Sequence, residues 1–393
     1  MKSMRIARWY HIVCSLALAA ITVSCTLDPE TSKQRYLERG TAYSAEGKYN
    51  EAIIELKNAL QIDPRFLPAL YQLGLNYKAK GWLADAAREL HKVTALKPDW
   101  TEGRVALGLV YVEMEAWDNA LVEATKIRET DPTNVQGMYI ASLALRGTSR
   151  SVEALNMIES AIRVDPNLPE LYRTQGDILS QLNKRADAER SYRTALSKNP
   201  NSADAYVGLG ELLLAQGDRR GAESAFRQAK ALKPSSARAR LALALWYSAE
   251  RMYPEAIAEL EAIPKPSRPP TVDMALGEFY VRTNRNDEAV QVLAPLVQRA
   301  PQSVQPRFLL GHAYLGANNL ILAINQFEEA VKLAPSNPLT HYSLGVAYLR
   351  SGRPKEALKA LGEAGKDLAA LPGYWINVGL ARIQLGQDRK SVV

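Results

Sequence analysis

Apolar and small residues recur along most of the chain every three to four positions, the pattern of amphipathic α-helices. Residues 33–66 divide into two such halves, which contain Tyr36, Gly40 and Tyr43, then Ala52, Leu56 and Ala59. Small side chains at Gly40 and Ala52 would let two antiparallel helices approach closely, while the larger ones fill the space around them. The pattern predicts a helical hairpin.

Prolines repeat with a fixed period. The interval from Pro64 to Pro98 is here called the repeat period. It recurs four more times without change, at Pro132, Pro166, Pro200 and Pro234. The same interval separates Pro301 from Pro335 near the C-terminus. Because proline ends a helix, each predicts the end of a hairpin's second helix.

The repeat period and the Gly40/Ala52 pattern resemble the tetratricopeptide repeat family over residues 33–386. The resemblance implies an all-α fold, a right-handed superhelical solenoid of tandem helix-turn-helix hairpins. We expect repeats 1–7 over 33–263 and repeats 8–10, with the first helix of an eleventh, over 271–386. Residues 387–393 form a tail with no second helix, which predicts either a longer protein or a partner at this end.

A proline-rich break at 264–270 interrupts the seventh repeat and predicts that its second helix ends early. A distorted link between repeats is the simpler interpretation. A kink between two superhelical segments, or an exposed polyproline-like docking strand, remains an alternative.

The first 24 residues are typical of an export signal: Lys2, Arg5 and Arg8 precede an uncharged stretch, and Ser24 comes before Cys25. Residues 25–32 then form a short tether. The segment Ile21–Cys25 resembles a bacterial lipoprotein box, which implies lipid attachment at Cys25. Thr22 stands where that box usually has leucine, so cleavage to a soluble periplasmic protein is the alternative.

The second cysteine, Cys14, lies within the leader, so Cys25 has no disulfide partner after cleavage. We therefore predict a protein of the cell envelope that faces the periplasm. Thr26 is not the aspartate that retains lipoproteins at the inner membrane, which favours the outer membrane.

Charge and candidate chemistry exclude several function classes. Without residues 1–24 the chain has 46 basic and 42 acidic side chains, and these are interspersed, so no nucleic-acid partner is expected. His91, His312 and His341 lie in different repeats without metal-ligand spacing, and we interpret them as solvated surface residues. We expect no catalytic residues, no cofactor and no metal site.

The resemblance implies a concave groove lined by positions 5, 9 and 12 of each first helix. Eleven residues carry this prediction: Tyr71, Leu75, Lys78, Val105, Leu109, Val112, Tyr139, Leu143, Arg146, Arg173 and Asp177. Phe308, His312 and Leu315 are their counterparts in a later repeat. Some of these residues could instead pack between neighbouring helices.

The function expected is a non-catalytic protein–protein interaction scaffold. The leader and repeats together resemble envelope lipoproteins that organise exopolysaccharide export or exosortase-linked (PEP-CTERM) surface-protein systems, so envelope or secreted proteins are the expected partners. Two alternatives remain open: the N-terminal region of a longer glycosyltransferase or peptidase, and a pilus or outer-membrane assembly factor.

Overall fold

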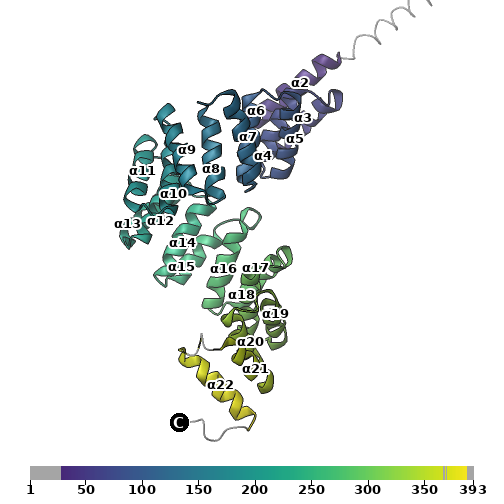
Figure 1. Ribbon diagram of the computed structural model, residues 1–393. Helices are drawn as coiled ribbons and strands as arrows, with labels where there is room; N and C mark the ends of the chain where they lie inside the picture. Colours follow the sequence, from purple (N-terminus) through teal and green to yellow (C-terminus); the bar gives the residue numbers. More distant parts are fainter. Residues whose placement is uncertain (1–27, 366–367, 369, 387–393) are drawn as a thin grey trace, which may run out of the picture. The chain divides into compact units, whose positions relative to one another are not determined.

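The computed structural model describes residues 28–365, 368 and 370–386. These residues form 21 α-helices and one short 3-10 helix, and they contain no β-strand. The helices group into two compact units, Met1–Lys198 and Asn199–Val393. The predicted all-α fold of stacked hairpins is confirmed, and Figure 1 shows the paired helices in order along each unit.

The described part of the first unit consists of five antiparallel hairpins. They pair α2 (Pro29–Ala45) with α3 (Tyr49–Ile62), α4 (Leu67–Ala79) with α5 (Leu83–Leu96), α6 (Thr101–Glu113) with α7 (Trp117–Thr130), α8 (Val135–Gly147) with α9 (Ser151–Val164), and α10 (Pro169–Gln181) with α11 (Arg185–Lys198).

The second unit repeats this arrangement and ends, in its described part, on a single helix. It pairs α12 (Ala203–Ala215) with α13 (Arg219–Leu232), α14 (Ala237–Ala249) with α15 (Tyr253–Glu261), α16 (Pro270–Arg282) with α17 (Asn286–Arg299), α18 (Val304–Gly316) with α19 (Leu320–Leu333), and α20 (Pro338–Arg350) with α21 (Pro354–Ala364), followed by α22 (Pro372–Gln384).

The periodic prolines end the second helices as predicted. α3 ends at Ile62 and α5 at Leu96, in each case two residues before the proline of the period. Proline has no N–H to continue the helix, and its ring fixes φ for the link into the next hairpin. These prolines therefore mark where the second helix of a hairpin ends.

Glycines set the distance between the two helices of a hairpin. A Cβ atom added at Gly40 would lie 2.8 Å from Leu56 Cγ, and one at Gly210 would lie 2.5 Å from Phe226 Cε1. Real Cβ atoms do not approach a neighbour so closely, so the large side chain of the second helix occupies the space that glycine leaves. The predicted close crossing at Gly40 is confirmed.

The seventh repeat is shortened in its second helix. α15 has 9 residues, against 14 in α13 and α17, and the 3-10 helix Lys265–Ser267 follows it. Arg268 donates hydrogen bonds to the carbonyl oxygens of Ile263 (2.7 Å) and Glu261 (3.0 Å), which stabilises the end of α15. The early end of this helix is confirmed, while the domain boundary placed here stays a prediction.

An arginine connects the link between two repeats to the second helix of the following hairpin through hydrogen bonds. Arg104 donates to the carbonyl oxygen of Pro98 (2.6 Å) and to Glu123 (2.7 Å). Arg240 repeats this arrangement in the second unit, with the carbonyl oxygen of Pro234 at 2.7 Å and Glu259 at 2.7 Å. Glu123 is buried, and a buried carboxylate needs charged or hydrogen-bonding partners. Arg104 and Lys126 both form ion pairs with it.

Candidate partner-binding groove

The eleven predicted groove residues lie on four first helices of the first unit. α4 carries Tyr71, Leu75 and Lys78, and α6 carries Val105, Leu109 and Val112. α8 carries Tyr139, Leu143 and Arg146, and α10 carries Arg173 and Asp177. Each of these helices contacts the next one in the series. Equivalent side chains, separated by one repeat period, therefore lie on one continuous face.

Five of the predicted residues line a single pocket of about 400 Å³ between α4, α6 and the start of α8. They are Tyr71, Leu75, Lys78, Val105 and Leu109. The aromatic and aliphatic side chains give the pocket an apolar interior, while Lys78 supplies charge at its edge and forms an ion pair with Glu113 (3.1 Å). A pocket of this kind suits an apolar side chain of a partner.

Trp100 holds the Tyr71 ring in place. The two ring centroids are 4.8 Å apart, and Lys97 lies over the face of Trp100, 5.8 Å from its centroid. Burial raises the pKa of the Tyr71 hydroxyl, and the nearby Glu102 carboxylate raises it further. Tyr71 therefore remains a neutral hydrogen-bond donor at physiological pH.

The sequence prediction missed part of the pocket wall. Glu102 and Gln136 line it one repeat period apart, in the first turns of α6 and α8. Asn134 also lines it and caps α8 by accepting a hydrogen bond from the Gly137 N–H (2.9 Å). Positions 5, 9 and 12 came from the family resemblance, and the repeat period could have added the Glu102/Gln136 pair to them.

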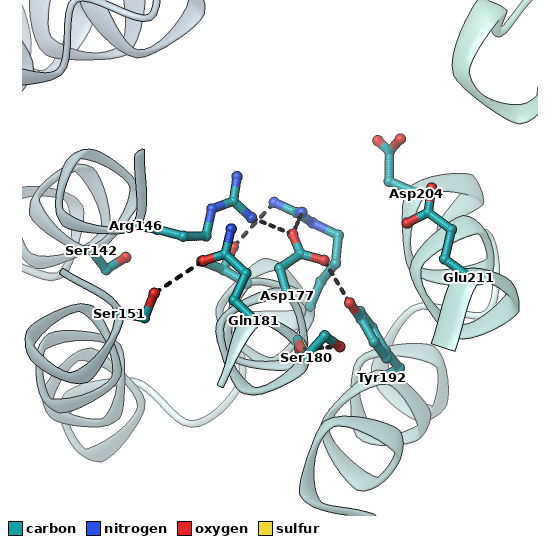
Figure 2. Close-up of polar contacts among 12 residues, drawn as sticks. Ser142, Arg146, Ser151, Asp177, Ser180, Gln181, Tyr192, Asp204 and Glu211 are labelled. Carbon is teal, nitrogen blue, oxygen red and sulfur yellow. Dashed lines mark hydrogen bonds and ion pairs between the residues drawn. The ribbon is translucent and has the colours of Figure 1, made fainter. Parts of the chain in front are cut away.

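A polar network lies on the same face at α8 and α10. The Asp177 carboxylate accepts hydrogen bonds from Arg146 (2.8 Å), Arg173 (2.7 Å) and the Tyr192 hydroxyl (2.8 Å). Figure 2 shows the carboxylate facing both the Arg146 guanidinium and the Tyr192 ring. Arg173 also donates to the Tyr139 hydroxyl at 3.4 Å. Four predicted residues thus meet in one network, here called the Asp177 network (Tyr139, Arg146, Arg173, Asp177 and Tyr192).

Two guanidinium groups and one carboxylate give the Asp177 network a formal charge of +1. The side chains are partly withdrawn from water, with exposed fractions of 26% for Arg146 and 12% for Asp177. Reduced solvation strengthens charge interactions compared with those of exposed ion pairs. The network therefore presents a fixed, cationic hydrogen-bonding surface.

Leu143 departs from the prediction, because only 7% of it is exposed. Most of α8 is buried, including Ile140, Ala141 and Ala144, since neighbouring helices pack on several sides of it. Leu143 therefore packs between helices instead of lining the groove. Val112 is partly buried and does not line the pocket beside Leu109.

His312 also departs from the prediction, and its interpretation as a solvated surface residue is wrong. Its ring packs against Phe308 (centroids 4.6 Å apart) and Phe327 (5.1 Å), and Nε2 lies 3.1 Å from Ser343 Oγ. Burial lowers the pKa of the imidazole, because the charged form would lose its hydration. His312 is a neutral packing residue near pH 7.

No group of histidine, cysteine, aspartate and glutamate side chains suited to a metal ion occurs among the described residues. In the same part of the chain, every helix is too short or too polar to traverse a lipid bilayer. Cys25 and the leader lie outside the described residues, so lipid attachment stays a prediction.

Protein-family models match several segments of the chain. A model described as tetratricopeptide repeat matches residues 173–237, 211–270 and 308–373, and one described as TPR repeat matches residues 40–81. Together the matches span more than half of the sequence. No curated protein matches the chain significantly.

Solved structures align with the chain at low sequence identity. The APC/C hetero-tetramer Cut9–Hcn1 aligns with 18% identity over 90% of this chain and 76% of that chain, with a TM-score of 0.54. PilF of Pseudomonas aeruginosa aligns with 20% identity over 54% of this chain and 96% of its own, with a TM-score of 0.43. Yeast Tom70 aligns with 15% identity over 92% and 97%, with a TM-score of 0.43.

Proposed function

The chain belongs to the tetratricopeptide repeat family, and on that basis we propose that it is a non-catalytic scaffold whose first unit binds a protein partner in the groove of α4, α6, α8 and α10. One observation carries the proposal: nine of the eleven groove residues converge, five in one apolar pocket and four in the Asp177 network. Convergence of apolar anchors and fixed charges is a property of binding surfaces.

The two parts of the groove select different features of the partner. The pocket around Tyr71 and Leu109 accommodates an apolar side chain and supplies most of the binding energy. The Asp177 network, with its surplus positive charge, favours an acidic group on the same partner and supplies selectivity. We propose an extended or helical segment with one apolar anchor and one acidic residue.

Groove substitutions test this proposal. The triple variant Tyr71→Ser, Leu109→Ala and Tyr139→Ala should lose partners that the wild-type chain recovers from an envelope extract, and it should bind an isolated partner at least about tenfold more weakly. The matched control replaces three exposed apolar residues on second helices of the same unit, Ile54→Ser, Val122→Ser and Val152→Ser.

Circular dichroism first establishes that both triple variants fold. If the groove variant recovers the same partners as the wild-type chain, this face is not the binding surface. The proline-rich segment 264–270 and the C-terminal end would then be the surfaces to test.

We further propose that the scaffold acts in the bacterial cell envelope as an outer-membrane lipoprotein. The basic, then apolar leader and the position of Cys25 at its end support this location. An organising role in secretion, exopolysaccharide export or surface-protein assembly would fit a lipid-tethered scaffold that faces the periplasm.

Replacement of the cysteine tests the anchor. Cys25→Ser should abolish metabolic labelling of the protein with a radiolabelled fatty acid, because the thiol is the group that receives the lipid. Cys14→Ser is the matched control and should leave labelling unchanged, since that residue lies within the leader. Equal labelling of Cys25→Ser and wild type would rule out a lipid on Cys25.

A further inference from the structure

A second pocket of the first unit, of about 390 Å³, is lined by residues of α9, α10 and α11 and of the turn before α11. Glu159 lines it from α9, Leu179 from α10 and Lys184 from that turn. We call it the Glu159 pocket. Figure 1 shows these three helices side by side. None of the residues that line it belongs to the groove or to the Asp177 network, so a role for this pocket is independent of the function proposed above.

Two charged side chains of the Glu159 pocket have no partner in the described part of the chain. The other two charged groups in its wall, Asp187 and Arg190, form an ion pair with each other. Glu159 and Lys184 form no ion pair or side-chain hydrogen bond with another described residue. Glu159 is also partly buried, and a carboxylate that has lost part of its hydration gains from a hydrogen-bond donor. The pocket therefore suits a group that donates to Glu159.

Tyrosine side chains supply such a donor at the equivalent position of two hairpins in the second unit. Glu261 and Glu328 correspond to Glu159, since each stands five residues after the small alanine of its second helix. The Tyr280 hydroxyl of the following hairpin donates to Glu261 at 2.7 Å, and the Tyr348 hydroxyl donates to Glu328. Burial and the hydrogen bond to Glu261 raise the pKa of Tyr280 to about 12, so the hydroxyl keeps its proton.

A cation covers the ring in the same arrangement. Arg285 lies over the Tyr280 ring, 4.5 Å from its centroid, and the Tyr348 ring is covered at the same distance. Arg285 stands five residues after Tyr280, which is the spacing of Lys184 after Leu179. Leu179 has neither an aromatic ring nor a hydroxyl. The Glu159 pocket therefore has the carboxylate and the cation of this arrangement but lacks the tyrosine that joins them.

We propose that the Glu159 pocket binds a tyrosine side chain of a partner protein, whose hydroxyl donates to Glu159 and whose ring lies under the Lys184 ammonium group. A hydrogen bond to a carboxylate is stronger than one between neutral groups, and a cation over an aromatic face adds to it. A protein side chain is the occupant because protein tyrosines fill the equivalent positions in the second unit. Phenylalanine is a poor substitute, since it leaves the carboxylate without a donor.

A pentapeptide with a central tyrosine between glycine and serine residues serves as the probe. We expect it to bind the full chain saturably in a saturation-transfer NMR titration. The same peptide with phenylalanine in place of tyrosine should bind at least about fivefold more weakly, and Glu159→Gln should weaken binding of the tyrosine peptide to a similar extent. Glu153→Gln, also on α9, is the matched control, because Glu153 pairs with Arg150 and does not line the pocket.

Leu179→Tyr places the missing tyrosine in the chain itself. This variant should lose binding of the peptide, because its own ring would occupy the pocket. It should also raise the urea midpoint of unfolding, since the new hydroxyl would donate to Glu159, and adding Glu159→Gln should remove most of that gain. If Leu179→Tyr does not fold, the comparison of Glu159→Gln with Glu153→Gln still decides the proposal.

Three results would overturn the proposal: no saturable binding of the tyrosine peptide, equal affinity for the tyrosine and phenylalanine peptides, or equal binding by wild type and Glu159→Gln. A titration with p-cresol distinguishes the other source of a phenol. Binding of p-cresol without binding of the tyrosine peptide would assign the pocket to a free small molecule and exclude a partner's side chain.

Discussion

Replacing Gly311 with valine should lower the free energy of unfolding of the second unit by about 3 kcal/mol. The crossing of α18 and α19 leaves no room for a side chain, because even a Cβ atom would lie 2.6 Å from Phe327 Cε1. Phe327 is fully buried and packs against Phe308 and His312, so it cannot rotate away. The two helices would have to separate and lose part of this cluster.

Gly362→Val provides the matched control for Gly311→Val. Gly362 is also helical, on α21, but no atom lies within 4 Å of its ideal Cβ position. The same substitution should therefore change stability by only a few tenths of a kcal/mol, from the difference in helix propensity. Urea denaturation followed by circular dichroism compares the two. Equal midpoints for both variants would show that the crossing glycine does not limit the helix–helix distance.

The repeat architecture was predictable because the same pattern of proline, glycine and apolar residues recurs from hairpin to hairpin. Proline at the end of a second helix and glycine at the crossing have local physical consequences, which do not depend on distant partners. The same regularity allowed the groove register to be carried from α4 to α10. Five residues predicted in this way, among them Tyr71 and Leu109, do line one pocket.

The predictions for Leu143 and His312 were wrong for a different physical reason, because the burial of these residues depends on how individual side chains fill the space between helices. Leu143 occupies a groove position in the sequence, yet helices on several sides bury it. His312 was interpreted as solvated because it has no metal-ligand spacing, but Phe308 on its own helix and Phe327 and Ser343 on other helices surround its ring. The repeat period specifies which face a residue lies on, but not the size of its neighbours.

The Asp177 network shows the same limit. The sequence placed Arg146 and Asp177 on one face but did not predict that their side chains would pair between α8 and α10. Pairing depends on the rotamers of long side chains and on the Tyr192 hydroxyl, which reaches Asp177 from α11. Such contacts can be inferred only once the helices are in place.

Replacing Asp177 with alanine should destabilise the first unit by about 2 kcal/mol. The change removes the carboxylate that accepts from Arg146, Arg173 and Tyr192, and it leaves two guanidinium groups facing each other. The loss is smaller than that expected for a fully buried ion pair, because 26% of the Arg146 side chain is exposed to water. Urea denaturation of the variant and of the wild-type chain measures it.

Ser180→Ala, on the same helix, is the control, because Ser180 Oγ donates a local hydrogen bond to the carbonyl oxygen of Gly176 (2.9 Å) and is not part of the Asp177 network. This change should alter stability by less than about 0.5 kcal/mol.

Adding Arg146→Met to Asp177→Ala should restore part of the lost stability, because it removes one of the two repelling cations. Higher salt should also narrow the gap to wild type, since mobile ions screen the repulsion. Equal midpoints for Asp177→Ala and Ser180→Ala would mean that the network does not stabilise the groove, and the selectivity attributed to its fixed charges would lose its structural basis.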